Sequence, residues 1–216
     1  MLERYPEPKD WYHVRFSDEI HFGFGPQGKI RIIRRPGERF CPDCLQERRP
    51  PAEKDLKRLH AWAAVGYNFK SELVFYDVPG NSNGKMSLQI YKDEILEKVV
   101  KSWLKKDGSE SFVLEEDGDS GHGTGKRNVV RDWKVAHHLN SYFNCSQSPD
   151  FAPIENAWSA PKQWIAQFES WDTDLLKSLA TEGWERLSQE RINSWVDEMP
   201  QRLRDCIDSG GKLTGG

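Results

Sequence analysis

The sequence predicts an α/β fold in which a mixed sheet is flanked by helices and followed by a helical C-terminal extension. Three observations predict it. Short runs rich in aromatic and β-branched residues dominate residues 11–78, a helical period begins at residue 86, and helical patterns continue from residue 153 onward. Because strands come first and then alternate with helices, antiparallel and parallel neighbours are expected in one sheet.

Strands are predicted throughout the N-terminal part of the chain. Residues 1–10 contain two prolines and form a lead-in. Strand-like runs, rich in aromatic and β-branched side chains, follow at 11–24, 29–35, 60–67 and 71–78. A polar, proline-containing loop is expected at 46–58, and the turn-forming residues at 79–84 end this region.

The C-terminal part begins with an amphipathic helix over residues 86–106. Its apolar stripe recurs at three- and four-residue steps, at Leu88, Tyr91, Ile95, Val99 and Trp103. A short buried strand (112–114), a helix (126–138), a second short strand (141–145) and helices broken near 171–172 and 188 complete the order. An antiparallel meander followed by β-α-β-α-β and trailing helices is the layout of a ribonuclease-H-like domain. We expect that domain over 11–208, with a flexible tail at 209–216.

Composition is that of a folded protein. The 216 residues are 37% hydrophobic, and nine Trp, ten Phe and six Tyr supply the large side chains that a core needs. No run approaches the ~18 apolar residues of a membrane span, and the N-terminus does not resemble a signal peptide. The sequence therefore predicts a soluble intracellular protein.

Charged side chains are unevenly distributed along the sequence. Residues 29–58 carry ten basic and five acidic side chains, whereas residues 109–120 carry five acids and no base, within a net charge of −3. The basic run is a candidate phosphate-binding face and the acidic run a candidate cation site, although each is also typical of a solvated surface.

Cys41 and Cys44 form a CxxC without a second nearby pair, so two loop cysteines in a reducing compartment are favoured over a zinc or redox site.

Three acids stand out by their placement. Asp18 lies inside the first strand, where a buried carboxylate is costly without a cation or a donor. Asp117 follows the 112–114 strand, and strand ends of α/β sheets commonly build sites. Glu155 follows Pro153, which suits a first helical turn. If carboxylates from three elements converge, they can hold hard cations such as Mg²⁺, while each acid taken alone is more often a surface residue.

Local sequence then points to a family. SPDFAPIENAW at residues 148–158 strongly resembles the SPDLNPIENLW signature of mariner-superfamily DDE transposases. VLEEDGDSGH at 113–122 resembles that family's second-aspartate block, in which a His follows the Asp by five residues, and residues 11–22 resemble its first-aspartate strand. RRPGERF at 34–40 and MPQRL at 199–203 are also similar, so the resemblance covers nearly the whole chain in the correct order.

The resemblance implies a catalytic triad of Asp18, Asp117 and Glu155. Between the last two lie 37 residues, slightly more than the family's usual mid-thirties gap. Asp119 would give 35 and is the rival for the second position, but Asp117 is preferred for its step to His122 and its closeness to the strand. His122 is expected to organise the site or contact DNA, and a plain loop residue is the alternative.

The resemblance also implies an activity. It implies a DDE transposase/integrase-type domain that cleaves DNA strands and transfers them in cut-and-paste transposition of a mobile element. Two Mg²⁺ or Mn²⁺ ions would be held by the triad, with Asp18 bridging both. DNA is the expected partner, with a homodimer on DNA left open, and no membrane is expected. The location would be nuclear in a eukaryote and cytoplasmic otherwise, without secretion.

Some features depart from the family pattern. Ten residues before the first strand cannot contain the N-terminal helix-turn-helix domains of such transposases. Gly118 and Ala152 replace the commoner Asn, and Pro161 should kink the helix that bears Glu155. The net negative charge is unhelpful for binding DNA. The alternative function is therefore a catalytically inactive, transposase-derived nucleic-acid-binding or scaffold protein.

Overall fold

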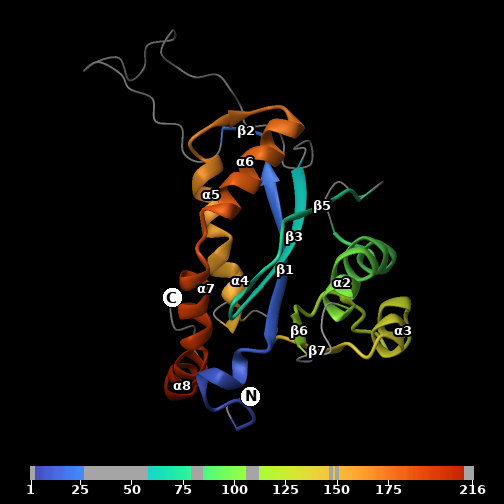
Figure 1. Ribbon diagram of the computed structural model, residues 1–216, viewed down its shortest axis with the longest axis vertical. Coiled ribbons are helices and arrows are strands. Elements are labelled where there is room, and N and C mark those ends of the chain that lie inside the picture. The colour runs from blue at the N-terminus through green and yellow to red at the C-terminus, as the bar shows by residue number, and fades with distance from the viewer. Residues whose placement is uncertain are drawn as a thin grey trace, which may run out of the picture.

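The computed structural model describes residues 3–26, 58–78, 85–105, 112–145, 148 and 151–211. Within them a six-stranded sheet has the order β4-β3-β1-β6-β7, and β5 also pairs with β3 (Figure 1). Its strands are β1 (Val14–Gly23), β3 (Arg58–Gly66), β4 (Phe69–Lys70), β5 (Val74–Tyr76), β6 (Val113–Glu116) and β7 (Asn140–Phe143).

The sheet mixes both directions of pairing, as the sequence predicts. β1 runs antiparallel to β3 along its whole length, and β3 is antiparallel to β4 and β5. β6 runs parallel to both β1 and β7. The ladder between β1 and β6 is short, because it ends at the pair Phe16 and Glu115. β1 therefore extends beyond its last pairing with β6, and the site lies at this opening.

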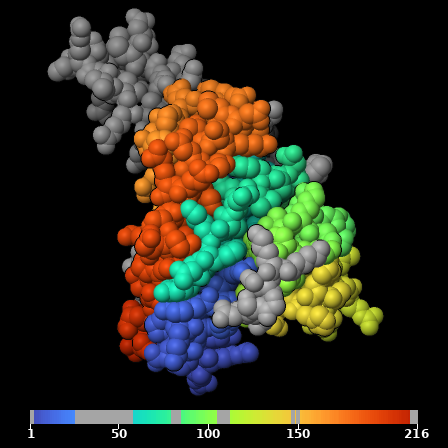
Figure 2. All heavy atoms as spheres, in the orientation of Figure 1, coloured from blue at the N-terminus to red at the C-terminus, as the bar shows by residue number. Residues whose placement is uncertain are grey.

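Helices cover the two faces of the sheet (Figure 1). One face carries α4 (Pro153–Ala157), α5 (Ser159–Ile165), α6 (Thr173–Glu185), α7 (Gln189–Asp197) and α8 (Met199–Asp208). The other carries α1 (Leu88–Ile90), η5 (Tyr91–Val100), α2 (Lys101–Lys105) and α3 (Val129–Ala136). In the space-filling view the C-terminal helices, orange to red, and the green and yellow elements lie on opposite sides of the strands (Figure 2).

The two faces hold separate cores. Phe16 and Ile20 of β1 point to the C-terminal helices, whereas Trp62 of β3 packs with the η5 and α3 side. Alternation along β1 therefore sends even-numbered side chains toward α4 and odd-numbered ones toward η5. Asp18 and Glu19 are thus directed to opposite faces. Within the described residues, none of the helices combines the length and apolarity that a bilayer crossing requires.

The helix predicted over 86–106 is present, but its middle is wider than expected. α1, η5 and α2 are continuous, and η5 is π-helical, with bonds such as Lys101 N–H to the Leu96 carbonyl. This wider turn stacks residues five apart, so Tyr91 and Leu96 are both fully buried, whereas Val99 of the predicted stripe is half-buried. A three- and four-residue period cannot reveal such a turn.

The C-terminal helices break where the sequence indicates. Asp172 and Ser188 cap α6 and α7 by accepting bonds from backbone N–H groups. Pro161, in the first turn of α5, lacks the N–H that would bond the Ala157 carbonyl, and the chain bends at Trp158 between α4 and α5. A two-stranded sheet of β2 (Gly25–Pro26) and β8 (Glu169–Ser170) was not predicted, because a two-residue strand has no readable period.

The remaining elements follow the prediction or lie outside it. Helix α3 and strands β6 and β7 match the predicted helix and short strands to within a few residues. At the N-terminus a 3₁₀ turn, η1 (Pro8–Trp11), packs against α7 and α8. The predicted strand at 29–35, the turn at 79–84, the cysteine pair at 41 and 44 and nearly all of the basic run at 29–58 lie outside the described residues.

Candidate active site

Two of the predicted acids lie on neighbouring strands at the same level. Asp18 is two residues beyond Phe16 in β1, and Asp117 is two residues beyond Glu115, just after β6. Since Phe16 and Glu115 are the last pair of a parallel ladder, both acids stand at the mouth where the strands separate. This is the carboxyl end of β6, the place where α/β sheets commonly build sites.

The third acid reaches the same cavity from a helix. Pro153 begins α4, and Glu155 lies in its first turn, as the sequence predicts. A cavity of about 440 Å³ is lined by Asp18, Asp117 and Glu155 together. Glu115 and Asp119 also line it. The structure therefore brings the three predicted carboxylates to one cavity, from β1, from the end of β6 and from α4.

Asp18 is half-buried beside a hydrogen-bond donor. The indole Nε1–H of Trp158 donates to Oδ2 of Asp18 at 2.9 Å. Burial, with further contributions from the charges of Glu19 and Glu155, raises the pKa of Asp18 to about 8, although the bond from Trp158 works against this. Without a bound cation, the ionised form of the Asp18 carboxyl is therefore disfavoured.

Glu115 adds a fourth carboxyl to the cavity. Its side chain is 3% exposed and accepts a hydrogen bond from the Tyr142 hydroxyl at 2.9 Å. Burial raises the pKa of Glu115 to about 8, and the charge of Asp18 adds to the effect. From the sequence, Glu115 belongs to the acidic run and to the second-aspartate block, and neither pattern identifies it as a cavity residue.

Glu116 points to the opposite face and does not add to the acidic cavity. It is 1% exposed and forms short bonds to the Tyr91 hydroxyl and to Nζ of Lys134. Period-two alternation along β6 separates it from Glu115. The five acids of residues 109–120 are therefore not one cation site.

Asp119 and Asp117 have different environments. Asp119 caps the short turn η6 (Ser120–His122) by accepting from Gly121 N–H at 2.7 Å, and it pairs with Lys85 at 3.3 Å. Oδ1 of Asp117 accepts from the Asp119 N–H at 2.9 Å and contacts Nδ1 of His122 at 2.6 Å. Asp119 is therefore engaged by the η6 backbone and Lys85, whereas Asp117 is engaged by His122, and both line the cavity.

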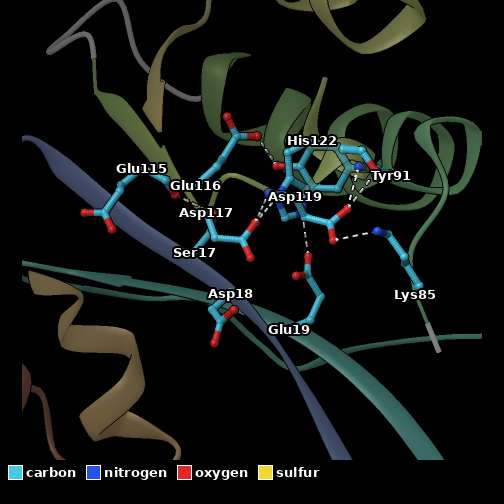
Figure 3. A network of polar contacts seen from close by, with 12 residues as sticks. Ser17, Asp18, Glu19, Lys85, Tyr91, Glu115, Glu116, Asp117, Asp119 and His122 are labelled. Carbon is cyan, nitrogen blue, oxygen red and sulfur yellow. Dashed lines mark hydrogen bonds and ion pairs between the residues drawn. The ribbon is translucent and has the colours of Figure 1, made fainter. Parts of the chain in front are cut away.

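His122 connects Asp117 to the neighbouring strand. It is 3% exposed, and Nε2 contacts Oε1 of Glu19 at 2.9 Å while Nδ1 contacts Asp117 (Figure 3). Burial alone would lower the pKa of His122, but Glu19, Asp117 and Glu116 outweigh it and hold that pKa well above its usual value. The same contact lowers the pKa of Asp117. Both nitrogens therefore donate, as in an imidazolium.

Two of these residues are not predicted from the sequence as site residues. Trp158 stands in the sequence as part of the PIENAW run, and Glu19 as the neighbour of Asp18. No local period identifies either contact, because Trp158 is 140 residues from Asp18 and His122 is 103 residues from Glu19. The Asp-to-His step of five residues was the one signal that pointed to His122.

Comparisons with known proteins agree with these observations. No protein-family model matches the chain. The Tcb2 transposase of Caenorhabditis briggsae is 27% identical over 212 residues, covering 94% of this chain and 70% of that protein. The Tcb1 transposase of the same species is 26% identical over 209 residues, covering 96% and 71%. The chain is similar over nearly its whole length to the Tcb1, Tcb2 and Tc1 transposases.

Solved structures show that the chain has the fold of the Mos1 mariner transposase catalytic domain. The two structures superpose over 99% of this chain and 90% of the Mos1 domain, with a TM-score of 0.64 and 16% identity. A Mos1 paired-end complex with the left transposon end matches with a TM-score of 0.75, also at 16% identity. The chain spans 60% of the Mos1 chain in that complex. The predicted ribonuclease-H-like class is confirmed.

The donor set of the cavity fits a divalent metal. Asp18, Asp117 and Glu155 offer hard carboxylate oxygens, which Mg²⁺ and Mn²⁺ prefer. Among the described residues, no Lys or Arg side chain forms an ion pair with Asp18, Glu115 or Glu155. A second group, Glu19, Asp117 and His122, has potential ligand atoms within 4.8 Å of one another. In this group both ring nitrogens of His122 are already in contact with carboxylate oxygens of Asp117 and Glu19, so a metal would have to replace these contacts.

Proposed function

We propose that this domain carries out DNA strand cleavage and strand transfer of the transposase type, supported by divalent metal ions. The observation that carries the proposal is the single cavity lined by Asp18, Asp117 and Glu155. Relationship to the Tc1/mariner transposases supports it independently.

Asp18, Asp117 and Glu155 would together hold Mg²⁺ or Mn²⁺ in the cavity. When bound, the ions would activate a water or a DNA 3′-hydroxyl and stabilise the leaving oxygen of an in-line displacement. The chain's own residues supply the positioning. Trp158 orients Asp18 by its N–H bond, and His122 holds one oxygen of Asp117, so that the other stays free for the cavity.

DNA is the proposed substrate and partner, with nuclear location in a eukaryotic cell. Mos1 forms paired-end complexes with transposon ends, and this chain has the fold of the Mos1 catalytic domain. Binding by the domain should be weak, independent of sequence and sensitive to salt, because phosphate contacts dominate where bases are not read.

Nicking of supercoiled plasmid DNA tests the proposal. The protein should convert it to open circles in Mg²⁺ or Mn²⁺ and not in EDTA. Asp18→Asn, Asp117→Asn and Glu155→Gln should each lower the rate at least a hundredfold. Asp208→Asn, an exposed acid at the end of α8, is the matched control and should nick at the wild-type rate.

Absence of metal-dependent nicking in the wild-type protein, with DNA binding retained, would favour the alternative of an inactive nucleic-acid-binding protein. Nicking that persists in all three acid variants would show a contaminating nuclease and contradict the assignment.

A further inference from the structure

The separation of β1 from β6 raises the question of what fixes the distance between Asp18 and Asp117. Their ladder stops at Phe16 and Glu115, so no strand pairing holds the two acids together. Both acids line one cavity, and a metal site requires its ligands at a defined spacing. A connection across this opening must come from side chains.

Two side chains cross the opening: the Ser17 hydroxyl donates to the Glu115 carbonyl at 2.7 Å, and His122 reaches beyond it to the level of the two acids. Its Nε2 contacts Glu19, the residue next to Asp18 in β1, and its Nδ1 contacts Asp117. Figure 3 shows the ring between these two carboxylates, while Asp18 points to the other side of its strand. One imidazole therefore joins the two strands directly beside both acids.

The ring itself is held in place from several directions. It packs against Tyr91 with ring centroids 4.5 Å apart, and its own carbonyl accepts a bond from Lys134 at 3.3 Å. Tyr91 and Lys134 are in turn both bonded to the buried Glu116 of β6. The position of His122 is thus fixed by η5, α3 and β6 rather than by its loop alone.

We propose that His122 is a positioning residue that sets the spacing of Asp18 and Asp117 by bridging Glu19 and Asp117. This inference rests on the proposed function, because it assigns His122 a role in the same site. His122 binds no metal in this role. It acts through Asp117, whose Oδ1 it occupies, and through Glu19, which carries the connection to β1.

Two substitutions test the two contacts of His122 separately. His122→Asn places an amide nitrogen near the Nδ1 position and keeps only the contact to Asp117. His122→Gln reaches the Nε2 position and keeps only the contact to Glu19. If bridging is what matters, each variant should bind Mn²⁺ at least tenfold more weakly and nick plasmid at least tenfold more slowly. His138→Asn is the control, since this exposed residue has φ 53°, a conformation that Asn tolerates.

A double-mutant cycle tests whether Glu19 is the second anchor. Glu19→Met keeps the approximate length of the side chain and removes both acceptor oxygens. Because Glu19→Met and His122→Asn break the same contact, the loss of Mn²⁺ affinity in the double variant should be no greater than the larger single loss. Fully additive losses would show that Glu19 acts separately and would overturn the bridge.

Amide hydrogen exchange in the metal-free protein separates this inference from the proposed function. The Asp119 N–H donates to Oδ1 of Asp117, so its exchange reports how that carboxylate is oriented. In His122→Gln it should exchange at least fivefold faster, with α6 amides unchanged. Faster exchange of the Asp119 N–H in His122→Gln, together with no nicking by the wild-type protein, would support the bridge and refute the proposed function. Unchanged exchange and unchanged Mn²⁺ affinity in both His122 variants would overturn the bridge, whatever the wild-type protein does to DNA.

Discussion

The indole N–H of Trp158 donates to Oδ2 of Asp18 at 2.9 Å, so the last residue of the PIENAW run contacts the acid of the first strand directly. Glu155, in the same run, lines the cavity with Asp18. One helical segment therefore supplies both a third carboxylate and the donor that orients the first. Because Glu155 lies in the first turn of α4 and Trp158 directly follows the helix, the three-residue step between them brings both side chains to Asp18.

Replacing Trp158 by Phe should lower plasmid nicking by more than the loss of packing alone would explain. Trp158 is 1% exposed, and the variant loses part of a buried ring together with a bond to a carboxylate. We expect a loss of about 2–4 kcal/mol in the free energy of unfolding, measured by urea denaturation. Plasmid nicking should fall about tenfold, because Asp18 is no longer oriented.

Trp184→Phe is the matched control for that experiment. Trp184 is 2% exposed, packs against Trp158 and donates its N–H to the Ser71 carbonyl at 2.8 Å, away from the acids. It should lose similar stability while nicking at the wild-type rate. Equal loss of nicking in both variants would show that general packing, and not the Asp18 contact, is responsible.

Divalent metal should stabilise the folded protein. Asp18, Glu19 and Glu155 repel one another without metal, and binding to the native state adds about 2.7 kcal/mol at a hundredfold excess over the dissociation constant. At millimolar Mn²⁺ we expect a rise in melting temperature of about 5 °C or more by calorimetry. Asp18→Asn should lose most of this rise and melt at or above the wild-type temperature in EDTA. An unchanged melting temperature of the wild-type protein in Mn²⁺ would contradict metal binding at this site.

Stability in EDTA should depend on pH through Asp18. Its pKa is raised to about 8 in the folded protein, so the native state binds a proton that the unfolded chain releases near pH 4. The Asp18 contribution to stability is therefore most favourable below about pH 4, falls as the pH rises from about 4 to about 8, and is constant above the folded pKa. Asp18→Asn removes this penalty, so its melting temperature relative to wild type should increase between pH 5.5 and 9. A constant difference across that range would contradict the raised pKa.

The buried pair of Lys134 and Glu116 should be essential for folding stability. Lys134→Met leaves the fully buried carboxylate of Glu116 without its cation, which should cost about 3–5 kcal/mol in urea denaturation. Lys134→Met with Glu116→Gln removes both charges and keeps a partner for Tyr91. This double variant should recover at least half of the loss. No recovery would show that Lys134 contributes by packing alone.

Much of the fold follows from local patterns, whereas the site depends on contacts between distant residues. The strand around Asp18, the position of Asp117 after a short strand and the Pro153 helix start are all readable from period and turn chemistry. The bridge from His122 to Glu19 and the bond from Trp158 to Asp18 are not, because both arise only when strands and helices pack. The opposite orientations of Glu115 and Glu116 follow from strand alternation once the strand bounds are known.

The most direct test of the central claim is anomalous diffraction from crystals of the protein soaked in Mn²⁺. We expect manganese in the cavity, with carboxylate oxygens of Asp18 and Asp117 on one ion and of Asp18 and Glu155 on a second ion about 4 Å away. His122 should remain between Glu19 and Asp117 without touching either ion. Manganese bound instead by Glu19, Asp117 and His122, or a cavity without manganese at saturating concentration, would contradict the account.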